Sequence, residues 1–211
     1  MKKILVVSPH PDDESLGCGG TLRKHVVEGD KVHIIFLTSG EKGGHGKPLH
    51  ETAKIREQEA KEAARILGIS QVEFWREPDS KFRVSERTIK KLQVKLKEWK
   101  PEVIYVTHDK EMHPEHRAAA RLVQRSLSNG LARVIRPQVF MFEVWTPLQR
   151  MDHIVDISEY IEKKRKAIQA HKSQCEVMDF DIALLALNRY RGEMHSWPGG
   201  EYAEIFARMN L

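Results

Sequence analysis

The beginning of the chain carries the pattern that most restricts its fold. Four apolar residues, ILVV at positions 4–7, are followed by the turn PHPDDE at positions 9–14. A short apolar run is typical of a strand buried inside a parallel sheet, and the prolines of the turn end that strand. The segment after the turn stops at Gly29, which predicts a helix closed by a glycine cap. The turn therefore joins the carboxyl end of a strand to a helix, the place where open α/β sheets bind ligands.

The turn itself carries chemically active groups. His10, Asp12 and Asp13 place one imidazole and two carboxylates within four residues. Such a set suits a divalent metal ion with a water molecule beside it. Alternatively, the acidic residues only favour the helix dipole, an effect of about 0.3–1 kcal/mol each. That alternative uses neither His10 nor the prolines, so the pattern favours metal chemistry.

Strands and helices alternate along the rest of the sequence. Apolar and β-branched runs predict strands, and segments of helical spacing bounded by glycine, serine or proline predict helices. The predicted strands are 31–38, 71–75, 103–107, 139–144 and 153–156, and the predicted helices are 51–67, 85–100, 117–128, 158–171 and 179–191. This alternation predicts a Rossmann-like, doubly wound, mostly parallel sheet with helices on both faces. A length of 211 residues fits one domain, residues 1–211.

A second unusual turn, HPEH at positions 113–116, follows the predicted strand 103–107. Pro114 fits the first position of a helix, so we expect His113 to cap that helix and His116 to project from its first turn on the same side. If the first strand and strand 103–107 are neighbours, the two turns face one crevice. Together they supply two histidines and a carboxylate, the ligand count of a catalytic zinc site. The same set also matches the Fe²⁺ triad, so ligand types leave the metal open.

The composition argues against nucleic-acid and membrane partners. Lysine and arginine number 35 against 30 acidic residues, a net charge of +5, but the two signs are mixed along the chain, as on a solvated surface. No run approaches the roughly 18 apolar residues of a membrane helix, and 4–7 is too short for a signal-peptide core, so we expect a cytoplasmic protein. Two distant cysteines, Cys18 and Cys175, predict neither a disulfide framework nor a thiolate zinc site.

The two turns and their flanks resemble the signatures of the LmbE-like, or PIG-L type, family of zinc-dependent N-deacetylases. PHPDDE is followed by GCGGT at 17–21, and HPEH by RAA at 117–119. Shorter matches continue along almost the whole chain: LTSGE at 37–41, Arg56 with Glu59, Pro78-Asp79, HKSQ at 171–174 and YAEIF at 202–206. The resemblance implies removal of an acetyl group from an N-acetylglucosamine unit attached to another sugar, inositol, malate or phosphatidylinositol.

The resemblance also implies a metal and its ligands. By this likeness, Zn²⁺, or another divalent ion such as Fe²⁺, is bound by His10, Asp13 and His116. Zinc lowers the pKa of a bound water to about 7 and polarises a carbonyl group, which suits amide hydrolysis at neutral pH. Members of the family often assemble as trimers or hexamers, so the likeness implies a homo-oligomer.

Catalytic roles follow from the same likeness. Asp12 is implied as the general base, His113 as an imidazolium that stabilises the tetrahedral oxyanion, and Arg56 as a group that fixes a polar substrate. The chain departs from the family pattern at Glu115, where aspartate is usual, and in the longer segment 109–113. These departures concern the support of His113 rather than the metal ligands.

Two other functions compete with this interpretation. A nucleotide-binding Rossmann domain needs GxGxxG after the first strand and an acidic residue after the second, but the chain has GCGG and Ser39-Gly40 there. The function of a metal-dependent hydrolase that acts on a different amide stays an open alternative, because nothing in the sequence identifies the group attached to the acetylated sugar.

Three further features have less specific interpretations. The glycine-rich segment 41–50 is either a mobile substrate loop or a plain connector. Structural roles are favoured for His171, which could cap the end of its helix, and for His195. The segment 197–200, which contains Trp197, is a candidate lining of the pocket.

Overall fold

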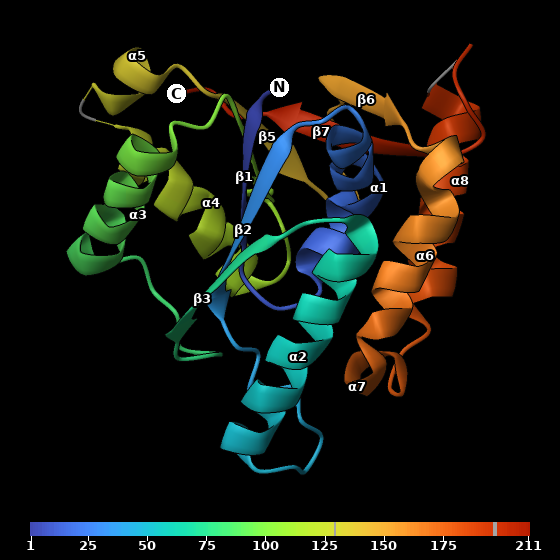
Figure 1. Ribbon diagram of the computed structural model, residues 1–211, viewed down its shortest axis with the longest axis horizontal. Helices are drawn as coiled ribbons and strands as arrows, with labels where there is room; N and C mark the ends of the chain where they lie inside the picture. The colour runs from blue at the N-terminus through green and yellow to red at the C-terminus, as the bar shows by residue number, and fades with distance from the viewer. Residues whose placement is uncertain (129, 196–197) are drawn as a thin grey trace.

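The computed structural model describes residues 1–128, 130–195 and 198–211. One sheet crosses the molecule between two layers of helices (Figure 1). The strands are β1 (Lys3–Ser8), β2 (Lys31–Thr38), β3 (Gln71–Glu77), β4 (Val103–Thr107), β5 (Gln138–Phe142), β6 (His153–Asp156) and β7 (Ala203–Arg208). The helices are α1 (Asp13–Val27), α2 (Leu49–Leu67), α3 (Glu86–Trp99), α4 (Pro114–Leu127), α5 (Leu131–Ile135), α6 (Ile161–Ala170), α7 (Lys172–Cys175) and α8 (Phe180–His195), with a 3-10 turn η1 (Ser158–Tyr160).

The order of the strands places β1 in the interior of the sheet, between β2 and β4. In the described residues the order is β3-β2-β1-β4-β5-β7-β6. The strands from β3 to β5 are parallel, and β7 is antiparallel to both of its neighbours. The predicted doubly wound, mostly parallel sheet is therefore confirmed. The chain order reverses between β1 and β4, which is the switch point where open sheets of this kind bind ligands.

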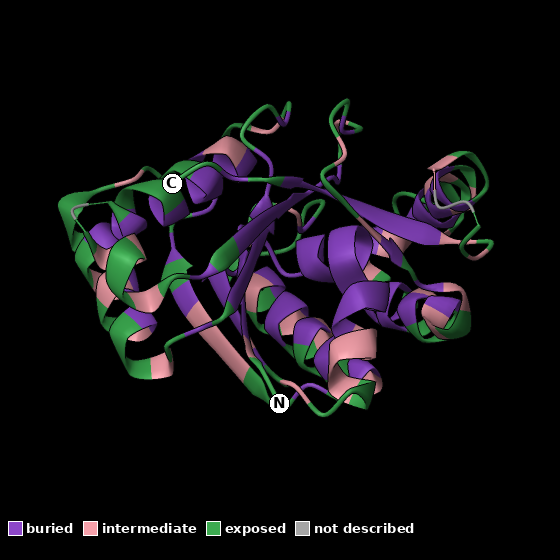
Figure 2. Ribbon diagram, turned by 90° about the horizontal axis from the view of Figure 1, so that it is seen from above, coloured by how far each residue is buried: buried purple, intermediate pink, exposed green. Residues whose placement is uncertain are grey.

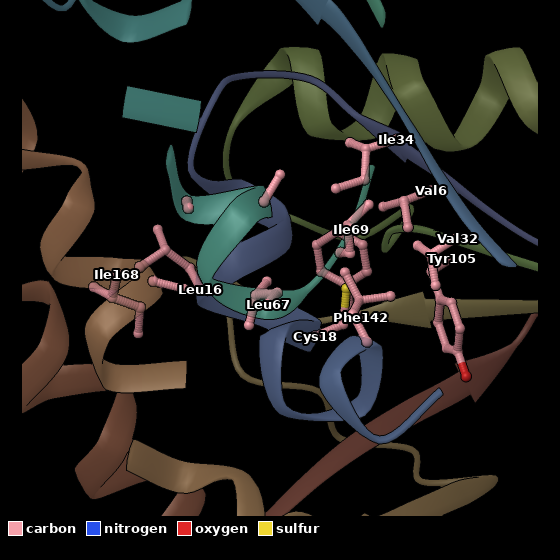
Figure 3. Packing of buried hydrophobic residues seen from close by; sticks show 14 of the residues in the cluster. Val6, Leu16, Cys18, Val32, Ile34, Leu67, Ile69, Tyr105, Phe142 and Ile168 are labelled. Atoms are coloured by element: carbon pink, nitrogen blue, oxygen red, sulfur yellow. The ribbon is translucent and has the colours of Figure 1, made fainter. Parts of the chain in front are cut away.

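Both faces of β1 are buried, which explains its continuous apolar run. Alternate side chains point to opposite faces. Ile4 and Val6 join a cluster with α1, α2, α6 and α8, whereas Leu5 and Val7 join a cluster with α3 and α4. Each such side chain stabilises the fold by about 1.5–3 kcal/mol. Figure 2 shows the buried strands between helices whose outer surfaces are exposed, and Figure 3 shows part of the first cluster around Phe142.

Helix ends follow the predicted signals closely. Gly68 ends α2 in the left-handed conformation, with a φ of 84°. Ser85 caps α3, and its side chain accepts a hydrogen bond from the backbone N–H of Thr88 at 3.2 Å. Pro114 begins α4, and His113 is its N-cap, as expected from the HPEH turn.

Some elements differ from the prediction. The sequence analysis missed β7, α5 and α7, and it extended β5 to Val144. The chain leaves β5 after Phe142 because the backbone N–H of Val144 donates to the Glu111 carboxylate instead of to a strand. In β7 the acidic residue Glu204 interrupts the apolar pattern, although it is only 1% exposed.

Glu204 also explains an irregularity in α1. The helix is broken at Cys18, which has a φ of −140°, and it begins again with the N–H groups of Gly20 and Thr21. These groups donate to the Glu204 carboxylate at 2.9 and 2.7 Å, and Lys164 Nζ lies 2.7 Å from the same carboxylate. Because negative charge is favourable at a helix N-terminus, Glu204 stabilises the second half of α1. The break leaves the first turn of α1 at the carboxyl end of β1, where the predicted metal ligands lie.

Candidate metal centre

The adjacency of β1 and β4 brings the two sequence turns together. His10 and Asp13 come from the turn after β1, and His116 comes from the first turn of α4. Asp13 Oδ2 lies 3.1 Å from His10 Nδ1, and Asp13 Oδ1 lies 3.1 Å from His116 Nε2. His10, Asp13 and His116 are 8%, 2% and 0% exposed. The structure therefore gathers the three residues for which a ligand role was expected.

His116 is a buried imidazole with carboxylates near both of its ring nitrogens. Its Nε2 lies 3.1 Å from Asp13 Oδ1 and its Nδ1 lies 3.9 Å from Glu111 Oε2, but neither nitrogen makes a hydrogen bond of good geometry with the described residues. A buried imidazole that faces two carboxylates suits a metal ligand with a supporting outer carboxylate. A second observation points the same way, because ring nitrogens of His10, His113 and His116 lie within 4.8 Å of one another. Two imidazoles and a carboxylate fit Zn²⁺ or Fe²⁺.

Glu115 supports His10 rather than His113. Its Oε2 lies 2.9 Å from His10 Nε2, and its Oε1 accepts the backbone N–H of Phe82 at 2.9 Å. Asp79 Oδ1 lies 3.6 Å from the same His10 nitrogen. Outer carboxylates of this kind set the tautomer and orientation of a ligating imidazole. With Nε2 bonded to Glu115, His10 presents Nδ1 to Asp13, so glutamate at this position keeps the His10 ring oriented.

Glu111 was missed by the sequence analysis. Its Oε1 accepts the backbone N–H groups of residues 144, 145 and 146 at 2.9, 2.7 and 3.1 Å. Its Oε2 lies 3.9 Å from His116 Nδ1, and the side chain is 1% exposed. No periodic pattern singles out this glutamate, because its partners lie more than thirty residues further along the chain. One carboxylate thus faces His116 and holds the segment after β5.

The acid–base state of the cluster depends strongly on its mutual contacts. Burial lowers the pKa of His116, but the Asp13 carboxylate outweighs burial and raises that pKa to about 9. Burial also lowers the pKa of His10, and bonds to Asp13, Asp79 and Glu115 raise it well above 6.5. Burial raises the pKa of Asp13, but the two imidazoles hold it well below its usual value. The raised pKa values favour the protonated form of both imidazoles at neutral pH, and a metal ion bound there would have to displace those protons.

Asp12 is held by Arg56 in a strained backbone conformation. Its φ is 144°, a value that non-glycine residues rarely adopt. Arg56 Nη2 donates to Asp12 Oδ2 at 2.8 Å and to the carbonyl of Pro11 at 2.9 Å, while Nη1 donates to the carbonyl of Gly40 at 2.9 Å. Burial raises the pKa of Asp12 to about 6, and the Arg56 guanidinium opposes that rise. Arg56 is 5% exposed, so its main contacts are with the turn itself.

His113 lies beside the two other imidazoles. Its ring centroid is 4.9 Å from that of His10 and 4.8 Å from that of His116. Its Nδ1 accepts the backbone N–H of Glu115 at 3.3 Å, so the neutral ring carries its proton on Nε2. Burial, together with the neighbouring His10 and His116, lowers the pKa of His113. The structure thus favours a neutral ring over the imidazolium form that the resemblance implied.

A pocket of about 240 Å³ opens beside these residues. It is lined by His10, Asp12, Asp13, Arg56 and His113, together with Leu16, Lys42, Gly43, Asp79, Ser80, Trp145, Gln174 and Phe180. A larger cavity of about 460 Å³, next to Arg150 and Arg208, is lined by none of the six expected site residues. The smaller pocket is the one that the chemistry identifies as a substrate site.

The segment 41–50 reaches this pocket at its beginning. The backbone N–H of Lys42 donates to Asp79 Oδ2 at 2.8 Å, and the carbonyl of Gly43 accepts a hydrogen bond from Gln174 Nε2 at 3.0 Å. Because Lys42 and Gly43 line the pocket, this segment is more than a plain connector.

The remaining histidine expectations concern the C-terminal third of the chain. His171 is the C-cap of α6, is 2% exposed and lies 3.9 Å from Glu14 Oε1. His195 is the last residue of α8, and its ring contacts Tyr190. Trp197, the expected lining residue next to His195, lies outside the described residues.

Comparison with known proteins gives the chain its relatives. The family described as PIG-L, GlcNAc-PI de-N-acetylase, matches residues 5–127. Diacetylchitobiose deacetylase of Thermococcus kodakarensis is 28% identical over 223 residues, which cover 97% of this chain and 82% of that protein. The 4-oxalmesaconate hydratase of Pseudomonas putida is 30% identical over 198 residues, which cover 85% of this chain and 76% of that protein.

The solved structures agree with these matches. The crystal structure of the conserved protein TT1542 from Thermus thermophilus is similar to this chain, with a TM-score of 0.86 and 32% sequence identity. That similarity covers 100% of this chain and 95% of the other. With the family match over residues 5–127, the two signature turns and this fold, the chain belongs to the PIG-L, or LmbE-like, family.

Proposed function

We propose that the protein is a zinc-dependent hydrolase that removes the acetyl group from an N-acetylglucosamine-containing small glycoside. The substrate would be a chito-oligosaccharide or another N-acetylglucosamine conjugate, and the products would be a free amine and acetate. One observation carries the proposal: Asp13 lies between two imidazoles, while the adjacent Asp12 is hydrogen-bonded to Arg56. Neighbouring carboxylates can therefore divide the roles of metal ligand and general base. The deacetylase among the relatives supports the same reaction.

His10, Asp13 and His116 would hold the metal ion. Zinc at this position would supply a Lewis acid for the acetyl carbonyl and make a water molecule acidic enough to react at neutral pH. The ligand types also fit Fe²⁺, so the choice of zinc is proposed and does not follow from the geometry of the three residues.

Asp12 is proposed to move the protons. A pKa of about 6 leaves its carboxylate mostly ionised at neutral pH and close to the working range of a general base. It accepts a proton from water during attack on the carbonyl carbon, and returns that proton to the amine nitrogen as the C–N bond breaks. Arg56 keeps the carboxylate ionised and oriented during both steps.

His113 is proposed to donate from Nε2 to the carbonyl oxygen as negative charge develops there. Its Nδ1 is occupied by the Glu115 N–H, which leaves Nε2–H as the available donor. A preorganised donor of this kind contributes about 3–4 kcal/mol to the transition state. The neutral ring suffices for this role, because a hydrogen bond to a developing oxyanion strengthens as its charge grows.

Hydration of a carbon–carbon double bond is a second candidate, because one relative is a hydratase. Acidic substrates of that kind need positive side chains in the pocket. Among the described residues, Lys42 and Arg56 are the lysine and arginine side chains that line it, and Arg56 is bonded to Asp12 and to backbone carbonyls. This shortage of free positive charge favours a neutral sugar.

Location and assembly stay predictions. Within the described part of the chain, no helix combines the length and apolar character that crossing a membrane requires. We propose a cytoplasmic enzyme that acts on small molecules without a nucleic-acid or membrane partner. The expected trimer or hexamer is tested by sedimentation velocity, and a monomer at micromolar concentration would contradict it.

Product analysis separates the two candidate reactions. Zinc-loaded protein is incubated with N-acetylglucosamine, its β-linked dimer, its malate and inositol conjugates, and 4-oxalmesaconate. We expect acetate and primary amine in equal amounts from at least one acetylated sugar. The matched controls are Asp12→Asn and the exposed surface variant Glu193→Gln. Hydration of 4-oxalmesaconate without acetate release from any sugar would reject the deacetylase proposal.

A further inference from the structure

The pocket is large enough for about one sugar ring. Its volume of about 240 Å³ lies below the roughly 300–1,000 Å³ of sites that enclose a drug-sized ligand. The exposure of its lining residues distinguishes floor from mouth, since Asp13 is 2% exposed and Trp145 is 42% exposed. A second ring on a substrate whose acetamide reaches Asp12 therefore lies at the mouth of the pocket, which Trp145 borders together with the exposed residues Lys42 and Ser80.

Trp145 offers an apolar surface at this mouth. It packs edge to face against Phe180, with ring centroids 5.7 Å apart and an interplanar angle of 77°. Phe180 is 9% exposed, so the pair forms a partly covered aromatic wall. The C–H face of a pyranose ring packs well on an aromatic side chain, because the aromatic ring is apolar and its face is electron-rich.

The backbone that bears Trp145 is firmly held. Its N–H group and those of both neighbours donate to Glu111 Oε1. In addition, the N–H of Met112 donates to Thr146 Oγ1 at 2.9 Å. A side chain on such a preorganised segment loses little freedom on binding, which leaves more of the contact energy for affinity. The position of the tryptophan is thus built into the same network that faces His116.

We propose that Trp145, with Phe180 behind it, forms a second sugar subsite that binds a neutral pyranose attached to the ring being deacetylated. The inference rests on the proposed function and deepens it, because it names an oligosaccharide rather than an acidic conjugate as the preferred substrate class. The aromatic pair gives apolar contact to a second sugar, whereas the charge of a malate or a phosphoinositide would meet Lys42 alone among the described lysine and arginine residues that line the pocket, apart from Arg56, which is bonded to Asp12.

Substrate preference tests the subsite. We compare kcat/KM for the β-linked dimer of N-acetylglucosamine with kcat/KM for the monosaccharide in wild type, Trp145→Ala and Trp145→Phe. The ratio of the two values is expected to fall about tenfold in Trp145→Ala, mainly through KM for the dimer, and to recover largely in Trp145→Phe. The control Tyr190→Ala, an exposed aromatic residue on α8, should leave the ratio as in wild type. An unchanged ratio in Trp145→Ala would overturn the subsite.

Binding without turnover separates this inference from the deacetylase proposal. Tryptophan emission is recorded as the dimer is added to Asp12→Asn and to Asp12→Asn with Trp145→Phe. A blue shift in the first that is absent from the second supports the subsite, even if the wild type releases no acetate and the proposed function fails. Binding of the dimer with no emission change that depends on Trp145 would overturn the subsite, even if the wild type is a deacetylase.

Discussion

Asp12 and Asp13 show how neighbouring identical residues acquire different chemistry. Asp13 lies between His10 and His116, and their positive charge holds its pKa well below the usual value despite burial. Asp12 is the next residue in the sequence, but its burial outweighs the opposing effect of the Arg56 charge and raises the pKa of Asp12 to about 6. The low pKa of Asp13 favours an ionised carboxylate suited to a metal ion, whereas Asp12 can take up and release a proton near neutral pH.

Replacement of Asp12 by asparagine separates these roles. Asp12→Asn should keep metal affinity, because the expected ligands are untouched, but kcat should fall by about 10²–10⁴ with the loss of general base catalysis. Metal content by mass spectrometry and steady-state kinetics measure the two effects. Asp13→Asn is the matched variant, in which metal affinity itself should fall. Wild-type turnover by Asp12→Asn would remove Asp12 from the mechanism.

Arg56 is predicted to act on Asp12 rather than mainly on substrate. The guanidinium lowers the Asp12 pKa, so its removal in Arg56→Met should raise that pKa by about 1–3 units. The acidic limb of the pH profile of kcat/KM should then move to higher pH, with a smaller shift in Arg56→Lys. If Arg56→Met raises KM and the acidic limb stays in place, the substrate-binding role implied by the family resemblance is the correct one.

At the scale of elements, a buried ion pair joins three parts of the fold. Lys164 of α6 and Glu204 of β7 are 0% and 1% exposed, and Glu204 also holds the restarted half of α1. Removing one partner leaves an uncompensated charge in the core. The pair as a whole adds little net stability, because burying two charges is itself costly. The large effect on the free energy of unfolding comes from removing one partner only.

Lys164→Met should therefore destabilise the protein by about 3–5 kcal/mol. Urea unfolding followed by circular dichroism measures the change. Arg189→Met breaks exposed pairs with Glu193 and Glu201, and it should leave the free energy of unfolding close to that of the wild type. Equal losses in the two variants would show that burial does not distinguish these pairs.

Strands bounded by clear turn signals could be predicted from sequence, whereas a strand whose apolar pattern is interrupted by a buried charge could not. The bounds of β2, β4 and β6 were predicted to the residue, since β-branched and apolar residues there meet clear turn signals. In β7 the acidic Glu204 hides a buried strand, because its partner Lys164 comes from a distant helix.

The candidate site divides in the same way. The two turns could be found because their residue types and spacing are local, and the neighbouring positions of β1 and β4 bring them together. Glu111 and Trp145 could not be assigned, because their roles come from a contact between segments more than thirty residues apart. A sequence pattern does not specify which backbone N–H groups a buried carboxylate such as that of Glu111 will accept hydrogen bonds from.

At the scale of the whole molecule, metal loading is coupled to protonation. His116 has a pKa of about 9, and that of His10 is also raised, so protons compete with the metal ion at lower pH. Zinc affinity should therefore rise between about pH 6 and pH 8, with release of protons on binding. Titration calorimetry in buffers of different ionisation enthalpy measures this release. Affinity that stays constant with pH would contradict the proton-bearing cluster.

The central claim is that metal held by the two turns enables amide hydrolysis. The most direct measurement is acetate release from acetylated sugars by metal-stripped protein, with and without stoichiometric zinc, in wild type and Asp12→Asn. We predict no release from stripped wild type, restored release after zinc addition, and little release from zinc-loaded Asp12→Asn. Undiminished release from stripped protein, or none from the zinc-loaded wild type, would contradict the account.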